Sequence, residues 1–88
     1  MSQPLREPLE HLHTELDKAD PDASDESLKT LKRDTKTTLE HPDPHVAVAE
    51  DPSYRTRLEE AVERFEVSHP GVTRAARNVL EVLTANGL

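Results

Sequence analysis

Apolar residues recur at steps of three and four along most of the chain, which is the spacing of one face of an α-helix. The first run predicts a helix over residues 7–19, and a second run, poorer in apolar residues, predicts one over 25–40. A third run predicts a helix over 53–68, and the run with the widest apolar face predicts one over 70–85. The pattern therefore indicates an all-α fold of four amphipathic helices.

The stretch between the second and third helices, residues 41–53, contains three prolines. Proline lacks an amide hydrogen and disfavours helix interiors and central strands, so we expect an irregular, proline-rich linker here. The breaks inside 7–40 and inside 53–85 are short, and each of these stretches is predicted to form an antiparallel helical hairpin. Together the two hairpins should form one small helical bundle, a single domain over residues 1–88.

The apolar faces of the last two helices define the predicted core and interaction surface. Phe65 is its largest side chain, and a buried aromatic ring contributes more apolar area than any aliphatic residue here. Arg57 and Arg64 lie one heptad apart beside the Phe65 stripe, at flanking positions typical of ion pairs between helices. The other positions assigned to this core and interaction surface are Leu58, Val62, Val72, Ala76, Val79 and Leu83.

A four-residue motif, Glu63-Arg64-Phe65-Glu66, is followed by His69-Pro70 and by a terminal helix that closes on Asn86-Gly87-Leu88. In these features the chain resembles an uncharacterised family of short bacterial all-helical proteins, a domain of unknown function marked by a Glu-Arg-Phe-Glu motif. The run Leu9-Glu10-His11-Leu12-His13 fits as well, so the resemblance extends over nearly the whole chain. The proline-rich linker departs from the family's pattern. The resemblance implies a helical bacterial protein and implies no activity.

The charge balance narrows the classes of partner. Eighteen acidic and eleven basic residues give a net charge of −7, which repels phosphate backbones and anionic membranes. We therefore expect neither nucleic acid nor a membrane as a partner. The first residues carry charges where a signal peptide needs an apolar stretch, and no run reaches the length of a membrane span. A cytoplasmic location is expected.

Two Glu-x-x-His pairs, Glu10 with His13 and Glu66 with His69, match part of the ligand set of a di-iron site in a helical bundle. At 100° per residue, both glutamates fall well away from the centres of the apolar faces. Such ligands would point to solvent rather than into a bundle interior. We therefore expect no di-iron site.

Catalytic machinery is also not expected. The chain has no cysteine and no nucleophile-elbow motif, and nucleophilic catalysis needs an activated side chain beside an oriented base. Its many carboxylates lie on the solvent faces of the predicted helices, where their pKa values are not tuned for acid–base catalysis. We expect a protein that is not an enzyme and has no cofactor.

The leading hypothesis is a non-enzymatic helical protein-interaction module that forms a homodimer. The last helix offers seven apolar positions whereas 25–40 contains three leucines, so the second hairpin is expected to need a second copy to cover its apolar surface. One alternative is an acidic DNA mimic or a factor that binds nucleoid proteins. Another is a metal-handling protein, since His41, Asp43 and His45 could offer ligands to Zn²⁺ or Ni²⁺, although a stable site needs three or four preorganised ligands.

Overall fold

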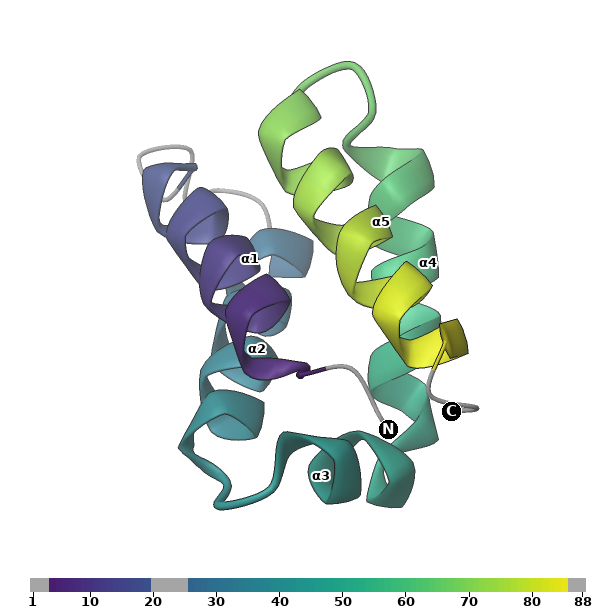
Figure 1. Cartoon of the computed structure of the whole chain (residues 1–88). Coiled ribbons are helices and arrows are strands. Elements are labelled where there is room, and N and C mark those ends of the chain that lie inside the picture. The colour runs from purple at the N-terminus through teal and green to yellow at the C-terminus, as the bar shows by residue number, and fades with distance from the viewer. Residues whose placement is uncertain (1–3, 20–25, 86–88) are drawn as a thin grey trace.

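The computed structural model describes residues 4–19 and 26–85, and the regular elements within these residues are all α-helices (Figure 1). The all-α class is therefore confirmed, with one helix more than the sequence predicts. Residue 25, where the second helix is predicted to begin, lies outside the described residues. The helices are α1 (Arg6–Lys18), α2 (Glu26–Glu40), α3 (Pro44–Glu50), α4 (Pro52–Arg64) and α5 (Pro70–Ala85).

The prediction of an irregular linker over residues 41–53 is wrong, because most of it forms α3. Pro44 is the first residue of this helix, where its missing amide hydrogen has no partner to lose. The Asp43 side chain caps the helix by accepting a hydrogen bond from the amide of His45 at 3.1 Å. Pro52 is likewise the first residue of α4, but no side chain among the described residues caps that helix. Two of the three prolines in this segment, Pro44 and Pro52, thus mark where helices start.

The third predicted helix ends earlier than expected. The regular part of α4 stops at Arg64, and residues 65–68 form a turn instead of continuing the helix to residue 68. Phe65 still donates its amide to the carbonyl of Ala61 at 2.9 Å. The residue before a proline is pushed out of the helical conformation, so the chain must leave the helix before Pro70, which opens α5.

The helices form two arms that α3 joins at one end (Figure 1). Contacts occur between α1 and α2 and between α4 and α5, and α1 also packs on α5 while α2 contacts α4. Because α1 contacts α5 and α2 contacts α4, the helices pack into one compact body, and α3 contacts both α2 and α4.

Two polar contacts tie α1 to α2. The Arg6 guanidinium donates to the carbonyl of Leu39 at 3.0 Å, so the start of α1 lies beside the end of α2. The Lys32 ammonium donates to the Asp17 carboxylate at 2.9 Å near the other end of α1. This hydrogen bond and the positive charge of Lys32 hold the pKa of the Asp17 carboxyl below its ordinary value.

Gly71 on α5 lies against the end of the Glu15 side chain on α1. Gly71 lies in the first turn of α5, and a Cβ atom at this position would collide with the carboxylate of Glu15 on α1. That carboxylate is also held by Lys18 at 3.5 Å and lies 3.6 Å from the His11 imidazole. Its negative charge beside the first turn of α5 is favourable, because helix N-termini carry partial positive charge.

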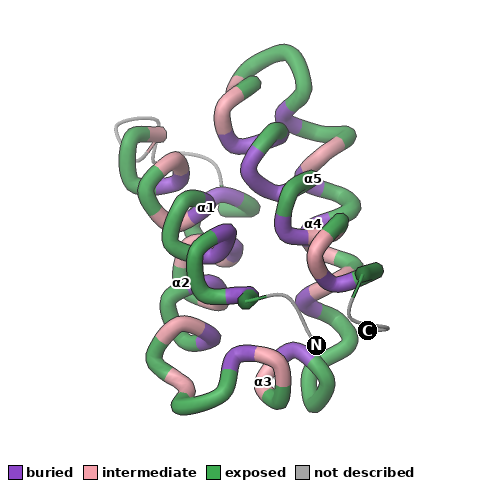
Figure 2. Tube along the Cα trace, in the orientation of Figure 1, coloured by how far each residue is buried: buried purple, intermediate pink, exposed green. Residues whose placement is uncertain are grey.

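The buried residues line the inner sides of both arms (Figure 2). Val62 is only half-buried and packs against the core. The premise that the second hairpin needs a second copy to cover its apolar surface is wrong. Helix α1 packs on α5, and its three buried leucines, together with Leu5 just before the helix, belong to the same cluster. The buried predicted positions are Phe65, Leu58, Val72, Ala76, Val79 and Leu83, and the α1 and N-terminal leucines are Leu5, Leu9, Leu12 and Leu16.

One hydrogen-bonded polar pair lies inside this core. The Thr35 hydroxyl and the Tyr54 phenol are 2.7 Å apart, and both residues are buried. Either can be the donor. Burial raises the pKa of the Tyr54 phenol above its ordinary value, so the phenol stays neutral in the folded protein.

We expect Tyr54→Phe to lower the free energy of unfolding by about 1–3 kcal/mol, because it leaves the buried Thr35 hydroxyl without its partner. The double variant Thr35→Val/Tyr54→Phe should be less destabilised than the two single variants added together, since it leaves neither group unpaired. Urea unfolding of the four proteins measures this coupling. Additive effects would show that the pair contributes nothing as a pair.

The stability of the parent and of Tyr54→Phe should depend differently on alkaline pH. In the unfolded chain the phenol ionises at about pH 10, whereas in the folded protein it ionises at a higher pH. The unfolded state therefore loses its proton first, and the free energy of unfolding falls as the pH rises above about 10. Tyr54 is the only tyrosine, so this contribution to the alkaline loss should be missing from Tyr54→Phe.

Candidate functional site

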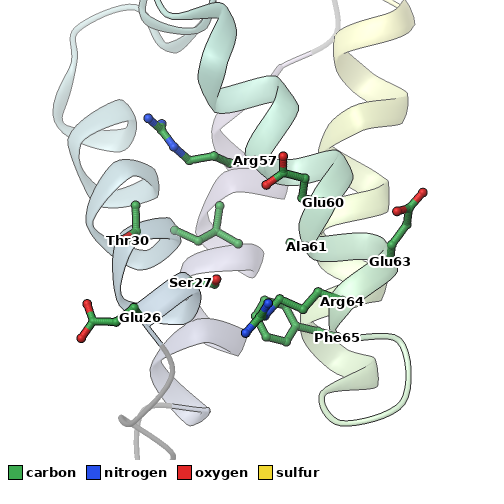
Figure 3. A pocket seen from close by; sticks show the side chains of 10 residues that line it. Glu26, Ser27, Thr30, Arg57, Glu60, Ala61, Glu63, Arg64 and Phe65 are labelled. Carbon is green, nitrogen blue, oxygen red and sulfur yellow. The ribbon is translucent and has the colours of Figure 1, made fainter.

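A cleft lies between α2 and α4, and we call it the α2–α4 cleft (Figure 3). Its volume is about 630 Å³, within the range of sites that hold small ligands or side chains of a partner. Residues from α2 form one wall, and residues from α4 and its C-cap form the other. The lining residues are Glu26, Ser27, Thr30, Leu31, Arg57, Glu60, Ala61, Glu63, Arg64 and Phe65.

The floor of the cleft is apolar and belongs to the core. Leu31, Ala61 and Phe65 are buried. The ring of Phe65 meets the His69 imidazole edge to face, with 5.7 Å between the ring centroids. The Arg64 guanidinium lies 5.8 Å from the centroid of the same ring, a distance at which cation and ring attract each other. Phe65 of the Glu63-Arg64-Phe65-Glu66 motif therefore belongs to this floor, with Arg64 beside its ring.

An ion pair joins the walls toward the α3 end of the cleft. Arg57 on α4 donates to the Asp34 carboxylate on α2 at 2.7 Å. Its guanidinium also lies 4.0 Å from the carboxylate of Asp51, the residue between α3 and α4. Arg57 thus links α2, α4 and the end of α3, and its charge is balanced within the chain.

The rim of the cleft carries carboxylates. Glu26 on α2 and Glu60 and Glu63 on α4 are exposed. Figure 3 shows Glu26 on the α2 side and Glu60 on the α4 side, with Glu63 directed outward. Within residues 4–19 and 26–85, no ion pair engages these three side chains. The charges still open to a partner at this rim are therefore negative.

The structure divides the predicted interaction residues into two groups. Arg57, Arg64 and Phe65 lie together in the cleft. The apolar residues of α5 do not reach it, because they are buried against α1 and α4: these are Val72, Ala76, Val79 and Leu83. Leu58 is likewise core, and Val62 lies at the core's edge.

Sequence reasoning did not place the polar residues of the α2 wall, Glu26, Ser27 and Thr30, opposite α4. In the sequence these residues appear only as part of the polar face of the second predicted helix. A polar face does not indicate which helix packs beside it. Helix α2 lies opposite α4 through contacts between distant segments, and α3 contacts both helices.

The candidate metal ligands of the sequence do not come together. Glu10 and Glu66 of the two Glu-x-x-His pairs are both exposed. In the turn before α3, the His41 ring nitrogen accepts a hydrogen bond from the Asp43 amide at 3.0 Å. Among the described residues, no group of three or more His, Cys, Asp and Glu side chains could hold a metal ion.

A second, shallower groove of about 450 Å³ lies between the start of α1 and α5. Its polar groups are Glu7, His11 and Asn78, and its apolar residues are Pro4, Pro8 and Val82. It contains no residue of the Glu-Arg-Phe-Glu motif.

Among residues 4–19 and 26–85, no helix is long and apolar enough to cross a membrane.

Comparison with protein families identifies a match over nearly the whole chain. The family described as a domain of unknown function (DUF4404) matches residues 5–88, so the resemblance to an uncharacterised family is confirmed. Comparisons with curated proteins and with solved structures give no match. The α2–α4 cleft lies entirely within the matched residues.

Proposed function

The chain belongs to the DUF4404 family, a domain of unknown function, and we propose that it is a non-enzymatic helical module that binds another protein through the α2–α4 cleft. The proposal follows from the site and not from the family, whose description supplies no activity.

The observation that carries the proposal is the composition of the cleft. An apolar floor of Leu31, Ala61 and Phe65 lies beneath a rim of exposed charged side chains. Protein interfaces combine an apolar centre with a polar, solvent-accessible rim in this way. A single apolar side chain of a partner could enter the hollow, while neighbouring residues contact the rim. Aromatic rings and arginines, both present here, are enriched at such centres.

We expect Thr30→Trp to prevent partner binding, because the indole would fill the hollow from the α2 wall. The matched control is Thr14→Trp, which places the same indole on the exposed side of α1. Each protein is used to capture partners from a lysate of the cells that encode it, and captured proteins are quantified by mass spectrometry. At least one protein retained by the parent and by Thr14→Trp should be lost about tenfold or more with Thr30→Trp. An identical set with Thr30→Trp would contradict the proposal.

The homodimer stays a prediction. The apolar surface from which it was inferred is covered within one chain by α1, so a dimer would have to use another surface. The mass in solution tests it, since a dimer has twice the 9.9 kDa of the chain. A cytoplasmic location likewise stays a prediction.

The alternatives differ in their support. The exposed glutamates at the cleft favour a basic protein as the partner, which is compatible with an acidic factor that binds nucleoid proteins. Metal handling by His41 and His45 has no supporting geometry in the described residues, because these histidines do not belong to a group of three potential ligands.

A further inference from the structure

We propose that the segment bound in the α2–α4 cleft is a basic amphipathic helix, with one apolar side chain seated on Leu31 and Phe65 and with lysines or arginines facing Glu26, Glu60 and Glu63. This inference rests on the proposed function and states the chemistry of the partner.

The charged side chains of the cleft that have no ion pair within the described residues are negative. Both arginines of the cleft are already engaged, Arg57 with Asp34 at 2.7 Å and Arg64 with the ring of Phe65. An acidic partner would have to compete with the Asp34 carboxylate for Arg57. The rim glutamates have no ion pair within the described residues, so a basic partner would displace nothing.

The exposed carboxylates of the rim come from both helices that form the cleft. Glu60 and Glu63 are one helical turn apart on α4, and Glu26 lies across the cleft on α2 (Figure 3). Residues with exposed carboxylates therefore stand on both sides of the apolar floor, and Figure 3 shows Glu60 directed toward the cleft and Glu26 and Glu63 directed away from it. Lysine and arginine suit this geometry, because their long apolar stems can cover the floor while their charged ends reach the rim. A helix that lays an apolar stripe into a groove is a common mode of peptide recognition.

The net charge of the whole chain also favours a basic partner. A net charge of −7 attracts a basic segment before contact and speeds its association. This general attraction would act anywhere on the surface, so the experiment must separate it from binding in the cleft.

The test uses three synthetic peptides of about fifteen residues, a length that can form a helix filling a groove. The first has leucines at helical spacing with lysines between them. The second has glutamate in place of each lysine, and the third has alanine in place of each leucine. Binding of each to the full chain is measured by isothermal titration calorimetry at low and physiological salt.

Two triple variants provide the comparison. Glu26→Gln/Glu60→Gln/Glu63→Gln removes the rim charges, and Glu10→Gln/Glu50→Gln/Glu81→Gln removes three exposed carboxylates outside the cleft lining. Both lower the negative charge equally, so general electrostatic attraction falls equally in both. The positions are exposed, and circular dichroism should show that both variants remain folded.

The basic leucine peptide should bind the parent more tightly than either other peptide. The rim variant should weaken this binding about tenfold, as expected for the loss of several exposed charge pairs, and the control variant by less than about threefold. Thr30→Trp should abolish it. Equal losses in both triple variants, or tighter binding of the acidic peptide, would overturn the proposed chemistry.

Failure of this inference is distinguishable from failure of the proposed function. If no peptide binds, or if only the acidic peptide binds and Thr30→Trp blocks it, the basic partner is excluded. The proposed function is then judged by the lysate capture with Thr30→Trp, which makes no assumption about the partner's charge.

Discussion

Replacing Phe65 with alanine is expected to lower the free energy of unfolding by about 3–5 kcal/mol. The ring is buried at the C-cap of α4, in the floor of the cleft, so truncation loses apolar burial and leaves a cavity between the arms. A whole domain is typically stable by about 5–15 kcal/mol. Thermal and urea unfolding followed by circular dichroism should therefore show a largely unfolded or poorly packed variant.

Two further variants separate the loss of buried apolar volume from the loss of the ring's contacts and from effects of the turn. Phe65→Leu keeps most of the apolar volume and removes the contacts of the ring with Arg64 and His69, and it should cost less than about 1.5 kcal/mol. Val67→Ala alters a side chain that is 94% exposed in the same turn and should change stability by less than about 0.5 kcal/mol. A Phe65→Ala protein that melts within a few degrees of the parent would show that Phe65 is not a core residue.

The second large effect is expected from Leu12→Ala on α1, at about 2–5 kcal/mol. Leu12 is completely buried, and α1 packs on both α2 and α5. The cavity left by the substitution therefore weakens the packing of α1 against α5, the most apolar helix. Denaturant unfolding at several protein concentrations measures the loss.

Thr14→Ala is the matched control, since Thr14 lies on the exposed side of the same helix and its truncation should change stability by less than about 0.5 kcal/mol. If Leu12→Ala were as stable as the parent, α1 would not be the element that covers α5. Stability that rose with protein concentration would then indicate cover by a second copy and restore the basis of the homodimer.

Helical periodicity located four of the five helices, because the spacing of apolar residues along one helix face is a local property. The fourth predicted helix, residues 70–85, matches α5. The missed helix, α3, is short and begins at Pro44 with Asp43 as its cap. A count of prolines predicted irregular structure there, whereas the position of each proline relative to a capping residue would have indicated a helix start.

The candidate site could be predicted only on one wall. The flanking arginines Arg57 and Arg64 and the motif around Phe65 are adjacent on one helix and could be recognised from their spacing. The residues opposite them could not. The contact of Arg57 with Asp34 joins positions 23 residues apart, and nothing in the local pattern of α2 specifies that α4 lies beside its polar face rather than solvent.

The sequence by itself determined the all-α class, most helix limits and the apolar face of each long helix, because these depend on residues three or four positions apart. Only the tertiary structure decided that α1 covers α5, that α3 connects the arms, and that α2 and α4 enclose a cleft. These features depend on contacts between distant segments, such as Arg6 with the carbonyl of Leu39 across 33 residues. An amphipathic helix specifies that its apolar face is buried, and several neighbours can satisfy that requirement equally well. The choice among them depends on how side chains from distant segments pack together, and no local spacing specifies that packing.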